Sequence, residues 1–485
     1  MSTKLSSRWK WLSLIYNFIA LYFNNCCIHG FRYLVKGMLM LLERFLWLIL
    51  LSISIYFCVV SCLSSVNRFQ TKSTHIGIER NSYKWNVSLP SITICPMQRL
   101  NDSRFAAYCL EHNVFGKDRT ELRDFLEQLA NSTYTNFENI PEYESIDHTL
   151  KNLNIEPENY MELIYNLSWD ATHSEESGRV RCTDGSYEIR VTQVLTEFGL
   201  CYVCNTFLGL EYSASYMLFG EYPQLNGVLN ESTMLPIKHG AFFEKDTGFT
   251  LIGFTNKAID TYLHSPHDVM RLDSNFGYTE EGSAYELEIE HITTEPNLEK
   301  TTSVSQRKCR FFHESNLEHY PFYTKNSCSQ ECRLNLAYKV CKCIPHFYPN
   351  SRVKNPKPVC SYKILKSCFP KHAGLFLKFY EANGHHGKID ECICEQNCRD
   401  SVIRLTKASV MRGSQMLLRS LGSSALVKFW PKNQFKRQVI FSFTDFLVSL
   451  GGTAGLYLGF SVLGLIELFY FFSMRLFWHI FGYQI

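Results

Sequence analysis

The feature that most constrains this chain is a long uncharged stretch near its C-terminus. Residues 446–466 carry no charged side chain, and the apolar character continues to Met474 with Glu467 as its one acidic interruption. About 20 apolar residues are needed to cross the ~30 Å hydrocarbon core of a bilayer. The length and composition of this stretch therefore predict a membrane-spanning helix.

The composition of this stretch differs from that of a plain membrane anchor. Gly451, Gly455 and Gly459 recur every four residues, which on a continuous helix forms a smooth face for the close approach of another backbone. A carboxylate such as Glu467 costs roughly 2.5–3.5 kcal/mol at the centre of a membrane and usually faces water or a partner. Together with Ser461, these residues indicate a pore-lining helix. A glycine-zipper anchor, with Glu467 near the membrane interface, is the alternative.

Residues 45–67 form another uncharged and largely apolar stretch, bounded by Arg44 and Arg68, which predicts a first membrane span at 44–67. A cleaved signal peptide, the alternative, would have a shorter apolar run nearer the N-terminus. The first 37 residues contain five basic and no acidic residues, and Arg475 follows the second span. Since cytoplasmic flanks carry an excess of Lys and Arg, both termini are expected in the cytoplasm.

The charge balance and the absence of catalytic motifs exclude two broad function classes. The chain has 49 basic and 46 acidic residues and a nearly neutral central region, so no nucleic-acid partner is expected. The sequence contains no H-E-x-x-H, G-x-S-x-G or phosphate-binding loop. His313, His319 and His346 are therefore interpreted as surface or core residues. We expect no enzyme activity and no cofactor.

Cysteines and glycosylation sequons indicate that the region between the spans faces an oxidising compartment. Fifteen of the 19 cysteines lie between residues 95 and 398. The sequons between the spans begin at Asn86, Asn101, Asn131, Asn166 and Asn230. Because fifteen is odd, at least one thiol is expected to be free or paired between chains.

Residues 309–398 are dense in cysteine and include two pairs with a spacing of four. Cys328/Cys332 and Cys394/Cys398 would each lie on one face of a helix, so two antiparallel helical segments could be joined rung by rung. Zinc is the alternative for the two Cys-x-Cys pairs of this segment. Those pairs lack the usual ligand spacing, and thiols oxidise in this compartment. We expect disulfides here and no metal site.

Other patterns predict the secondary structure between the spans. Alternating or β-rich runs predict strands at 88–95, 187–192, 248–254 and 285–292. Polar residues 117–170 predict a peripheral subdomain with a helix around 121–129.

Five short motifs resemble the degenerin/epithelial sodium channel (DEG/ENaC) family, and within it the insect pickpocket branch. They are Ile28-His29-Gly30, Leu89-Pro-Ser-Ile-Thr-Ile-Cys-Pro96, Gly199-Leu-Cys-Tyr202, the ten-cysteine block with Cys341-Lys-Cys-Ile-Pro-His-Phe-Tyr-Pro349, and Leu450-Gly-Gly with Gly459-Phe-Ser461 and Glu467. The motifs occur in the family's order between residues 28 and 470.

The resemblance implies a membrane protein with two transmembrane helices and a large disulfide-rich α/β extracellular domain. That domain would have the family's hand-like fold of palm, β-ball, knuckle, finger and thumb. The implied domains are a cytoplasmic N-terminus at 1–43, a first span at 44–67, the extracellular domain at 68–437 with its thumb at 309–398, a pre-pore segment and second span at 438–474, and a cytoplasmic tail at 475–485. The subunit would form a homotrimer, or a heterotrimer with related subunits, in the lipid of the plasma membrane.

The resemblance also implies the pore residues. Gly459, Phe460 and Ser461 take the place of the selectivity filter, whose oxygens would replace part of the hydration of a sodium ion. Glu467 matches a pore acid, and His29-Gly30 matches a cytoplasmic motif that controls opening.

Two positions depart from the family pattern at the outer mouth of the pore. Ser449 replaces the acid or amide of many relatives, and Val448 replaces a small residue. Bulk at the position of Val448 favours the open state in degenerins, so a standing current is expected.

The family's disulfide pattern implies a nested ladder in the cysteine-dense segment and one further bond. The implied pairs are Cys309–Cys398, Cys328–Cys394, Cys332–Cys392, Cys341–Cys368 and Cys343–Cys360, with Cys95–Cys201 outside the ladder. Cys109, Cys182 and Cys204 stay unassigned.

The function implied is that of a sodium-permeable, voltage-independent cation channel subunit, blocked by amiloride and gated by an extracellular chemical or mechanical stimulus. A non-conducting partner subunit or a two-pass receptor glycoprotein is the alternative. The nature of the stimulus, and the choice between homomeric and heteromeric assembly, stay open.

Overall fold

The computed structural model describes residues 18–26, 28–35, 40–80, 86–169, 181–183, 188–189, 191–222, 239–241, 248–252, 259–272, 277–279, 283–378, 392–410, 422–429 and 433–480. The chain divides into two compact units. We call residues 1–75, 300–307 and 438–485 the helical unit, and residues 76–299 and 308–437 the cysteine-rich unit.

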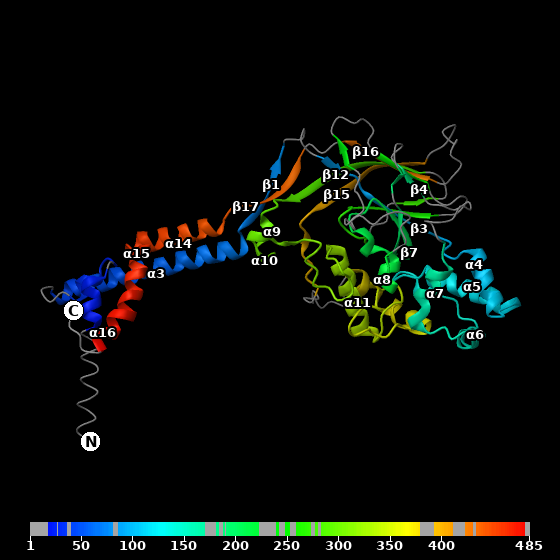
Figure 1. The fold of residues 1–485 in the computed structure, drawn as a ribbon, viewed down its shortest axis with the longest axis horizontal. Coiled ribbons are helices and arrows are strands. Elements are labelled where there is room, and N and C mark those ends of the chain that lie inside the picture. The colour runs from blue at the N-terminus through cyan, green and yellow to red at the C-terminus, as the bar shows by residue number, and fades with distance from the viewer. Residues whose placement is uncertain are drawn as a thin grey trace, which may run out of the picture. The chain divides into compact units, whose positions relative to one another are not determined.

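The helical unit contains two apolar helical segments that run beside each other (Figure 1). The first is α3 (Leu41–Thr71), which is long and apolar enough to cross a membrane. The second is made of α14 (Phe443–Leu458) and α15 (Val462–Tyr470), followed by a π-helical turn, η6 (Phe471–Arg475), and α16 (Leu476–Ile480). Residues 18–25 are helical, and α2 (Phe31–Val35) and α10 (Val304–Arg307) complete the described helices of this unit, apart from the part of α9 (Leu298–Thr301) that belongs to it.

The second apolar segment is broken, so the prediction of one continuous helix over residues 446–466 is wrong. The two halves, Phe443–Leu458 and Val462–Trp478, meet at an angle of 75° and have the length and hydropathy of a span only when taken together. Gly459 lies outside both helices and therefore does not extend the glycine face of Gly451 and Gly455. Hydrophobicity predicts the length of an apolar segment, and the capping residues at 459–461 decide its path.

The cysteine-rich unit is built on two main sheets. The larger has the strand order β1-β17-β12-β16-β9-β4-β5, with β15 also paired to β12, and the smaller has the order β11-β10-β3-β7-β6. The larger sheet consists of β1 (Thr74–Glu79), β4 (Arg181–Thr183), β5 (Glu188–Ile189), β9 (Gly248–Ile252), β12 (Ser283–Thr294), β15 (Asp400–Val410), β16 (Gly422–Phe429) and β17 (Gln434–Val439). The smaller consists of β3 (Ser91–Pro96), β6 (Val191–Thr196), β7 (Gly199–Cys204), β10 (Ile259–His264) and β11 (Gly277–Thr279). Two short pairs, β2 (Asn86–Ser88) with β8 (His239–Ala241) and β13 (Cys309–Arg310) with β14 (Gln396–Asn397), lie outside them.

Helices supply the rest of the cysteine-rich unit. They are α4 (Asp102–Glu111), α5 (Gly116–Ala130), α6 (Ile146–Asn152), α7 (Tyr160–Leu167), α8 (Ala214–Phe219), α11 (Lys325–Cys341), α12 (Tyr362–Cys368) and α13 (Ala373–Lys378), with 3-10 turns at 137–139, 157–159, 209–212 and 370–372. The larger apolar core joins these helices to β6 and β7. A smaller core contains buried side chains of both main sheets, including Ile94, Tyr202 and Leu287.

The predicted strands and the predicted helix all have counterparts in the structure. The four strand-forming runs correspond to β2 with β3, β5 with β6, β9, and β12. The helix expected around 121–129 is α5, which buries Leu122, Phe125 and Leu126 on one face.

Among the residues that the structure describes, fourteen cysteines form seven disulfides. Six of these are the pairs that the family pattern implies: Cys95–Cys201, Cys309–Cys398, Cys328–Cys394, Cys332–Cys392, Cys341–Cys368 and Cys343–Cys360. The seventh, Cys182–Cys204, joins β4 of the larger sheet to β7 of the smaller. Cys109 keeps a free thiol and is buried.

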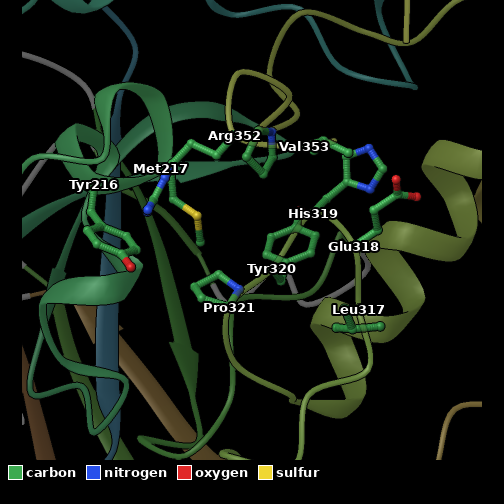
Figure 2. A pocket seen from close by; sticks show the side chains of 10 residues that line it. Tyr216, Met217, Leu317, Glu318, His319, Tyr320, Pro321, Arg352 and Val353 are labelled. Atoms are coloured by element: carbon green, nitrogen blue, oxygen red, sulfur yellow. The ribbon is translucent and has the colours of Figure 1, made fainter. Parts of the chain in front are cut away.

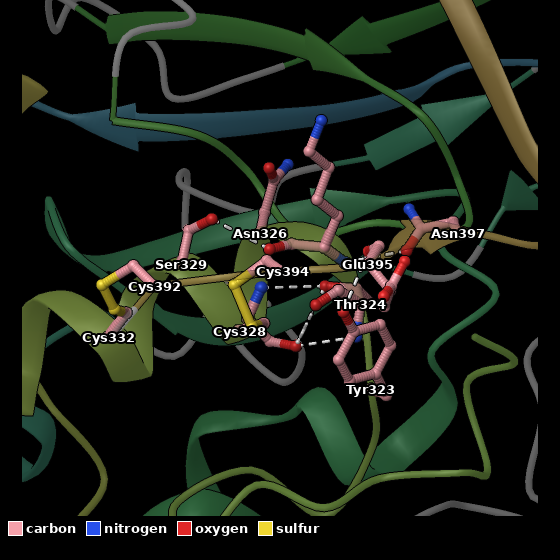
Figure 3. Close-up of a disulfide and its surroundings, with 12 residues drawn as sticks. Tyr323, Thr324, Asn326, Cys328, Ser329, Cys332, Cys392, Cys394, Glu395 and Asn397 are labelled. Atoms are coloured by element: carbon pink, nitrogen blue, oxygen red, sulfur yellow. Dashed lines mark hydrogen bonds between the residues drawn. A yellow bond between two sulfur atoms is a disulfide. The ribbon is translucent and has the colours of Figure 1, made fainter. Parts of the chain in front are cut away.

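The two middle rungs of the ladder differ from the expected pair of helices (Figure 3). Cys328 and Cys332 lie on α11, but the segment opposite them at 392–395 is not helical, and β14 follows it. Four residues of helix advance by about 6 Å, and two residues of extended chain advance by about 6.6 Å. Cys394 and Cys392 are therefore spaced correctly for Cys328 and Cys332. Since residues 392–395 are not helical and residues 396–397 form β14, the prediction of a second helical segment at Cys394–Cys398 is wrong.

Candidate functional site

The break between α14 and α15 is formed by three residues, Gly459, Phe460 and Ser461. Gly459 has a left-handed backbone, with φ of 65°, and its amide donates to the carbonyls of Ala454 and Gly455 at the end of α14. A left-handed residue that ends a helix is most often glycine. On the other side, the Ser461 hydroxyl accepts from the amide of Gly464, 3.2 Å away, and so caps the start of α15. The sequence Gly-Phe-Ser thus ends one helix and begins the next.

His29 contacts this break directly. Its backbone amide donates to the carbonyl of Leu458, the last residue of α14, at 3.1 Å. A Cβ atom added to Gly459 would lie 2.0 Å from Nδ1 of His29, far inside van der Waals contact. Position 459 therefore favours glycine for two reasons: its backbone is left-handed, and the imidazole of His29 occupies the place of a Cβ atom.

Gly30, which follows His29 in the chain, packs against α3. It has φ of 95°, and a Cβ atom at this position would lie 3.1 Å from the side chain of Leu51 on α3. The His29-Gly30 turn therefore contacts the end of α14 with one residue and α3 with the next.

Helices α3 and α14 are joined by polar and aromatic contacts. The hydroxyls of Ser65 and Ser449 lie 3.0 Å apart, and the rings of Phe69 and Phe446 stack with centroids 4.7 Å apart. Val448, next to Ser449, is 75% exposed. In this chain, Ser449 therefore faces α3, and Val448 points away from it.

A compact set of contacts surrounds the end of α3 at Thr71. The side-chain amide of Gln306, on α10, donates to the carbonyl of Phe69 at 3.2 Å. The amides of Ile440 and Phe441 donate to the carbonyl of Ser73 at 2.9 and 3.1 Å, and Arg68 lies 4.6 Å over the ring of Phe441. This set links the ends of both apolar segments to α10.

The other end of the second segment packs on the N-terminal helical residues. Phe18, Tyr22 and Phe471 form a small buried cluster, with the rings of Tyr22 and Phe471 5.1 Å apart. Glu467, which lies on α15, is exposed in the single chain.

Sequence reasoning missed the contacts of Ser65 and Gln306. Both are polar residues that belong to none of the motifs identified in the sequence. Gln306 is more than 200 residues from Phe69 along the chain. The sequence contains no local signal for either contact.

The cysteine-rich unit contains a buried carboxyl group, that of Asp268, beside the partly buried carboxyl group of Asp400. Asp268 Oδ2 accepts from the Asn397 side-chain amide at 2.9 Å, and its Oδ1 accepts from the amides of Val269 and Asn326, the latter in the first turn of α11. Burial, reinforced by the neighbouring Asp400, raises the pKa of Asp268 to about 7. Burial also raises the pKa of Asp400.

The predicted glycosylation sites differ in how free their side-chain nitrogens are. Asn166 is exposed, and Asn101 uses only its side-chain oxygen, to cap α4. Asn131 Nδ2, in contrast, donates to the carbonyls of Met97 and Glu127 at 2.9 and 3.0 Å. The side chain of Asn86 and all of Asn230 lie outside the described residues.

An apolar helix of membrane-spanning length, attached to a domain with seven disulfides, defines a membrane protein with a large domain of extracellular type. A family model described as "Amiloride-sensitive sodium channel" matches residues 22–471. The chain therefore belongs to the amiloride-sensitive sodium channel family, which is a family of channels and not of enzymes.

Individual relatives point to the insect branch of this family. Pickpocket protein 28 of Drosophila melanogaster is 25% identical over 337 residues, which cover 59% of this chain and 53% of the relative. Sodium channel protein Nach of Drosophila virilis is 24% identical over 187 residues, covering 36% of this chain and 46% of the relative. Degenerin-like protein unc-105 of Caenorhabditis elegans is 24% identical over 165 residues, covering 30% and 19%. These matches span about half or less of each relative's length, and the similarity is to pickpocket-like subunits.

Proposed function

We propose that the chain is a subunit of a sodium-permeable, voltage-independent cation channel that amiloride blocks and an extracellular chemical or mechanical stimulus opens. The observation that carries the proposal is the helix break at Gly459–Ser461 with His29 against it. A break in an apolar segment exposes backbone and hydroxyl oxygens at membrane depth, where irregular backbone is tolerated only in contact with protein or a water-filled path.

The proposed architecture follows the family. Residues 44–67 form the first span, and α14, the break and α15 together form the second, within residues 438–474. Residues 68–437 form a hand-like extracellular domain whose thumb is 309–398, and the termini, 1–43 and 475–485, are cytoplasmic. Subunits assemble as a trimer in the plasma membrane, either alone or with related chains. The seven disulfides support an oxidising location for the domain.

The proposed filter is Gly459-Phe460-Ser461. In a trimer, three copies of this break would surround an axis and offer carbonyl and hydroxyl oxygens, which are hard ligands suited to a sodium ion. Glu467, further along the same segment, would concentrate cations and repel anions. His29-Gly30 would control opening through the end of α14, because it contacts both α14 and α3.

Recordings of ionic current from cells that express the chain test this proposal. We expect a sodium current, and we expect Ser461→Leu to change the sodium/potassium permeability ratio or abolish the current at unchanged surface expression. Glu467→Gln should lower the single-channel conductance. A permeability ratio unaffected by substitution at both 459 and 461 would place the filter elsewhere.

A non-conducting partner subunit is the second candidate. It is supported at the outer mouth, where Ser449 replaces the acid or amide of many relatives and its hydroxyl is hydrogen-bonded to that of Ser65. Such a chain would give current only when expressed with a related subunit, and its Ser461 variant would leave the permeability ratio of the mixed channel unchanged.

A further inference from the structure

The cysteine-rich unit contains a pocket of about 200 Å³ that the proposed channel function does not use. Three segments line it: Tyr216 and Met217 of α8, the run 317–321, and the loop of Pro349, Arg352 and Val353. Arg352 extends toward Tyr216, while Glu318 and His319 lie on the opposite side (Figure 2). The pocket therefore has a cationic end and an end that contains a carboxylate.

Hydrogen bonds fix the two segments that face α8. The hydroxyl of Ser351 donates to the carbonyl of Leu218 on α8. Asn350 closes the loop by donating to the Lys357 carbonyl at 2.6 Å and accepting from the Lys357 amide at 3.0 Å. On the other side, the Glu331 carboxylate accepts from the amides of Glu318 and His319 at 3.0 and 2.9 Å. The pocket is thus formed before any ligand enters, which reduces the entropy cost of binding.

Arg352 is the residue that indicates what the pocket takes. Its guanidinium lies 4.4 Å over the ring of Tyr216, and no carboxylate among the described residues pairs with it. A guanidinium that lies over an aromatic ring and has no carboxylate partner retains N–H groups for another anion, and its planar edge matches a carboxylate with two parallel hydrogen bonds. Arg352 is therefore the residue of this lining that is suited to receive an anion.

The other residues that line the pocket determine what kind of ligand body fits beside Arg352. Met217, Pro321 and Val353 are apolar and face the same space, so they suit an apolar or aromatic body. At the other end, the Glu318 carboxylate lies 4.0 Å from Lys357 Nζ, so this lysine already has an anionic partner and Arg352 is the better site for a second anion. A ligand would thus bind with its carboxylate at Arg352 and its apolar body toward Pro321.

We propose that this pocket binds a small organic carboxylate with an apolar or aromatic body. The proposal concerns binding to the cysteine-rich unit and does not rest on ion conduction, so the two can fail separately.

The test measures binding of benzoate, and of its neutral analogue benzamide, to the purified full-length chain in lipid nanodiscs by ligand-observed NMR. We expect benzoate to bind, benzamide to bind more weakly, and empty nanodiscs to give no comparable signal. Removing a charge-assisted pair costs roughly tenfold to a hundredfold in Kd, so Arg352→Ala should weaken benzoate binding by at least tenfold.

Lys354→Ala is the matched control, since Lys354 lies on the same exposed loop, carries the same charge and does not line the pocket. It should bind benzoate as the wild type does. Val353→Trp fills the pocket while retaining Arg352, and it should also remove binding at an unchanged melting temperature. The proposal is overturned if the wild type does not bind benzoate, if benzamide binds equally well, or if Arg352→Ala and Lys354→Ala behave alike.

Discussion

The backbone amide of His29 donates to the carbonyl of Leu458 at 3.1 Å, although the two residues are separated by most of the chain. Leu458 ends α14, and its carbonyl is one of the four that a helix leaves without an internal partner. The turn before the first apolar helix therefore satisfies a backbone group at the break in the second. A movement of this turn would change the end of α14 without passing through any other element.

The contact between Gly459 and His29 predicts a pair of coupled effects. Gly459→Ala should lower the melting temperature of the purified protein, because its Cβ would lie 2.0 Å from His29 Nδ1 and a left-handed alanine adds roughly 1–2 kcal/mol. His29→Ala should recover part of this loss, with a coupling energy of about 0.5–3 kcal/mol in a double-mutant cycle.

Gly374→Ala is the control for that cycle, since nothing lies within 4 Å of its added Cβ and Gly374 lies on α13, outside the apolar segments. It should leave the melting temperature near that of the wild type. Additive effects of Gly459→Ala and His29→Ala would show that the two residues do not touch in the assembled protein.

The exposure of Val448 predicts a sodium current in the absence of a stimulus. This residue is 75% exposed in the chain alone, so in a trimer it is free to meet its copies, where overpacking costs typically ~1–3 kcal/mol. A closed state weakened by ~1.4 kcal/mol shifts tenfold toward the open one. We expect a standing sodium current that falls in Val448→Ala.

Val60→Ala provides the comparison for Val448, because it makes the same change on α3, where Val60 is 46% exposed. It should leave the standing current unchanged. If the wild-type homotrimer passes no standing current and Val448→Ala does not change this, Val448 does not meet its copies.

The sequence predicted the disulfide-rich domain better than it predicted the path of the apolar segments. The family resemblance implied six bonds that the structure contains. It did not imply Cys182–Cys204, because β4 and β7 belong to different sheets and only the tertiary fold brings them together. Hydropathy counts apolar residues and is blind to backbone angles, so it did not predict the break that the left-handed Gly459 and the Ser461 cap impose. Spacing likewise could not distinguish a helix from an extended segment opposite Cys328 and Cys332.

Asn131 is expected to carry no glycan, unlike Asn166. Both hydrogens of its side-chain amide have acceptors, the Met97 and Glu127 carbonyls, and a glycan would replace one of them. Asn166→Gln should therefore increase the electrophoretic mobility of the protein from an insect cell line, and Asn131→Gln should not. If Asn131→Gln shifts the band, the Met97 contact is absent from the mature protein.

The buried acid Asp268 predicts how stability changes with pH. Its pKa is raised by burial and by Asp400, to about 7 in the folded protein, whereas an exposed aspartate titrates near 3.9. The folded state therefore binds more protons than the unfolded state between about pH 4 and 7. The stabilisation from this group is fully present below about pH 4 and is lost as the pH rises through 7.

Asp400→Asn tests this effect. It removes the repulsion on Asp268, whose pKa should fall, and it removes the proton uptake of Asp400 itself, whose pKa burial raises. Both changes should make the decline of melting temperature between pH 5 and 7.5 shallower than in the wild type. The comparison variant is Glu158→Gln, on the exposed turn at 157–159, which should leave the slope unchanged. An equal slope in wild type and Asp400→Asn would mean that the two carboxyls do not interact.

The bond between Cys309 and Cys398 has a mechanical consequence. It holds Cα atoms 4.9 Å apart across a sequence separation of 89 residues. A pulling force that enters the main chain at Lys308 and leaves at Arg399 is carried by this one covalent link, so the residues between them bear no tension. Stretching the oxidised chain would therefore gain no length from them, and reduction of this bond together with the four nested inside it would release roughly 300 Å of hidden contour. Helix α11 can be displaced by what pushes against it, but not by a pull on β12 and β15, the strands on either side of the bonded segment.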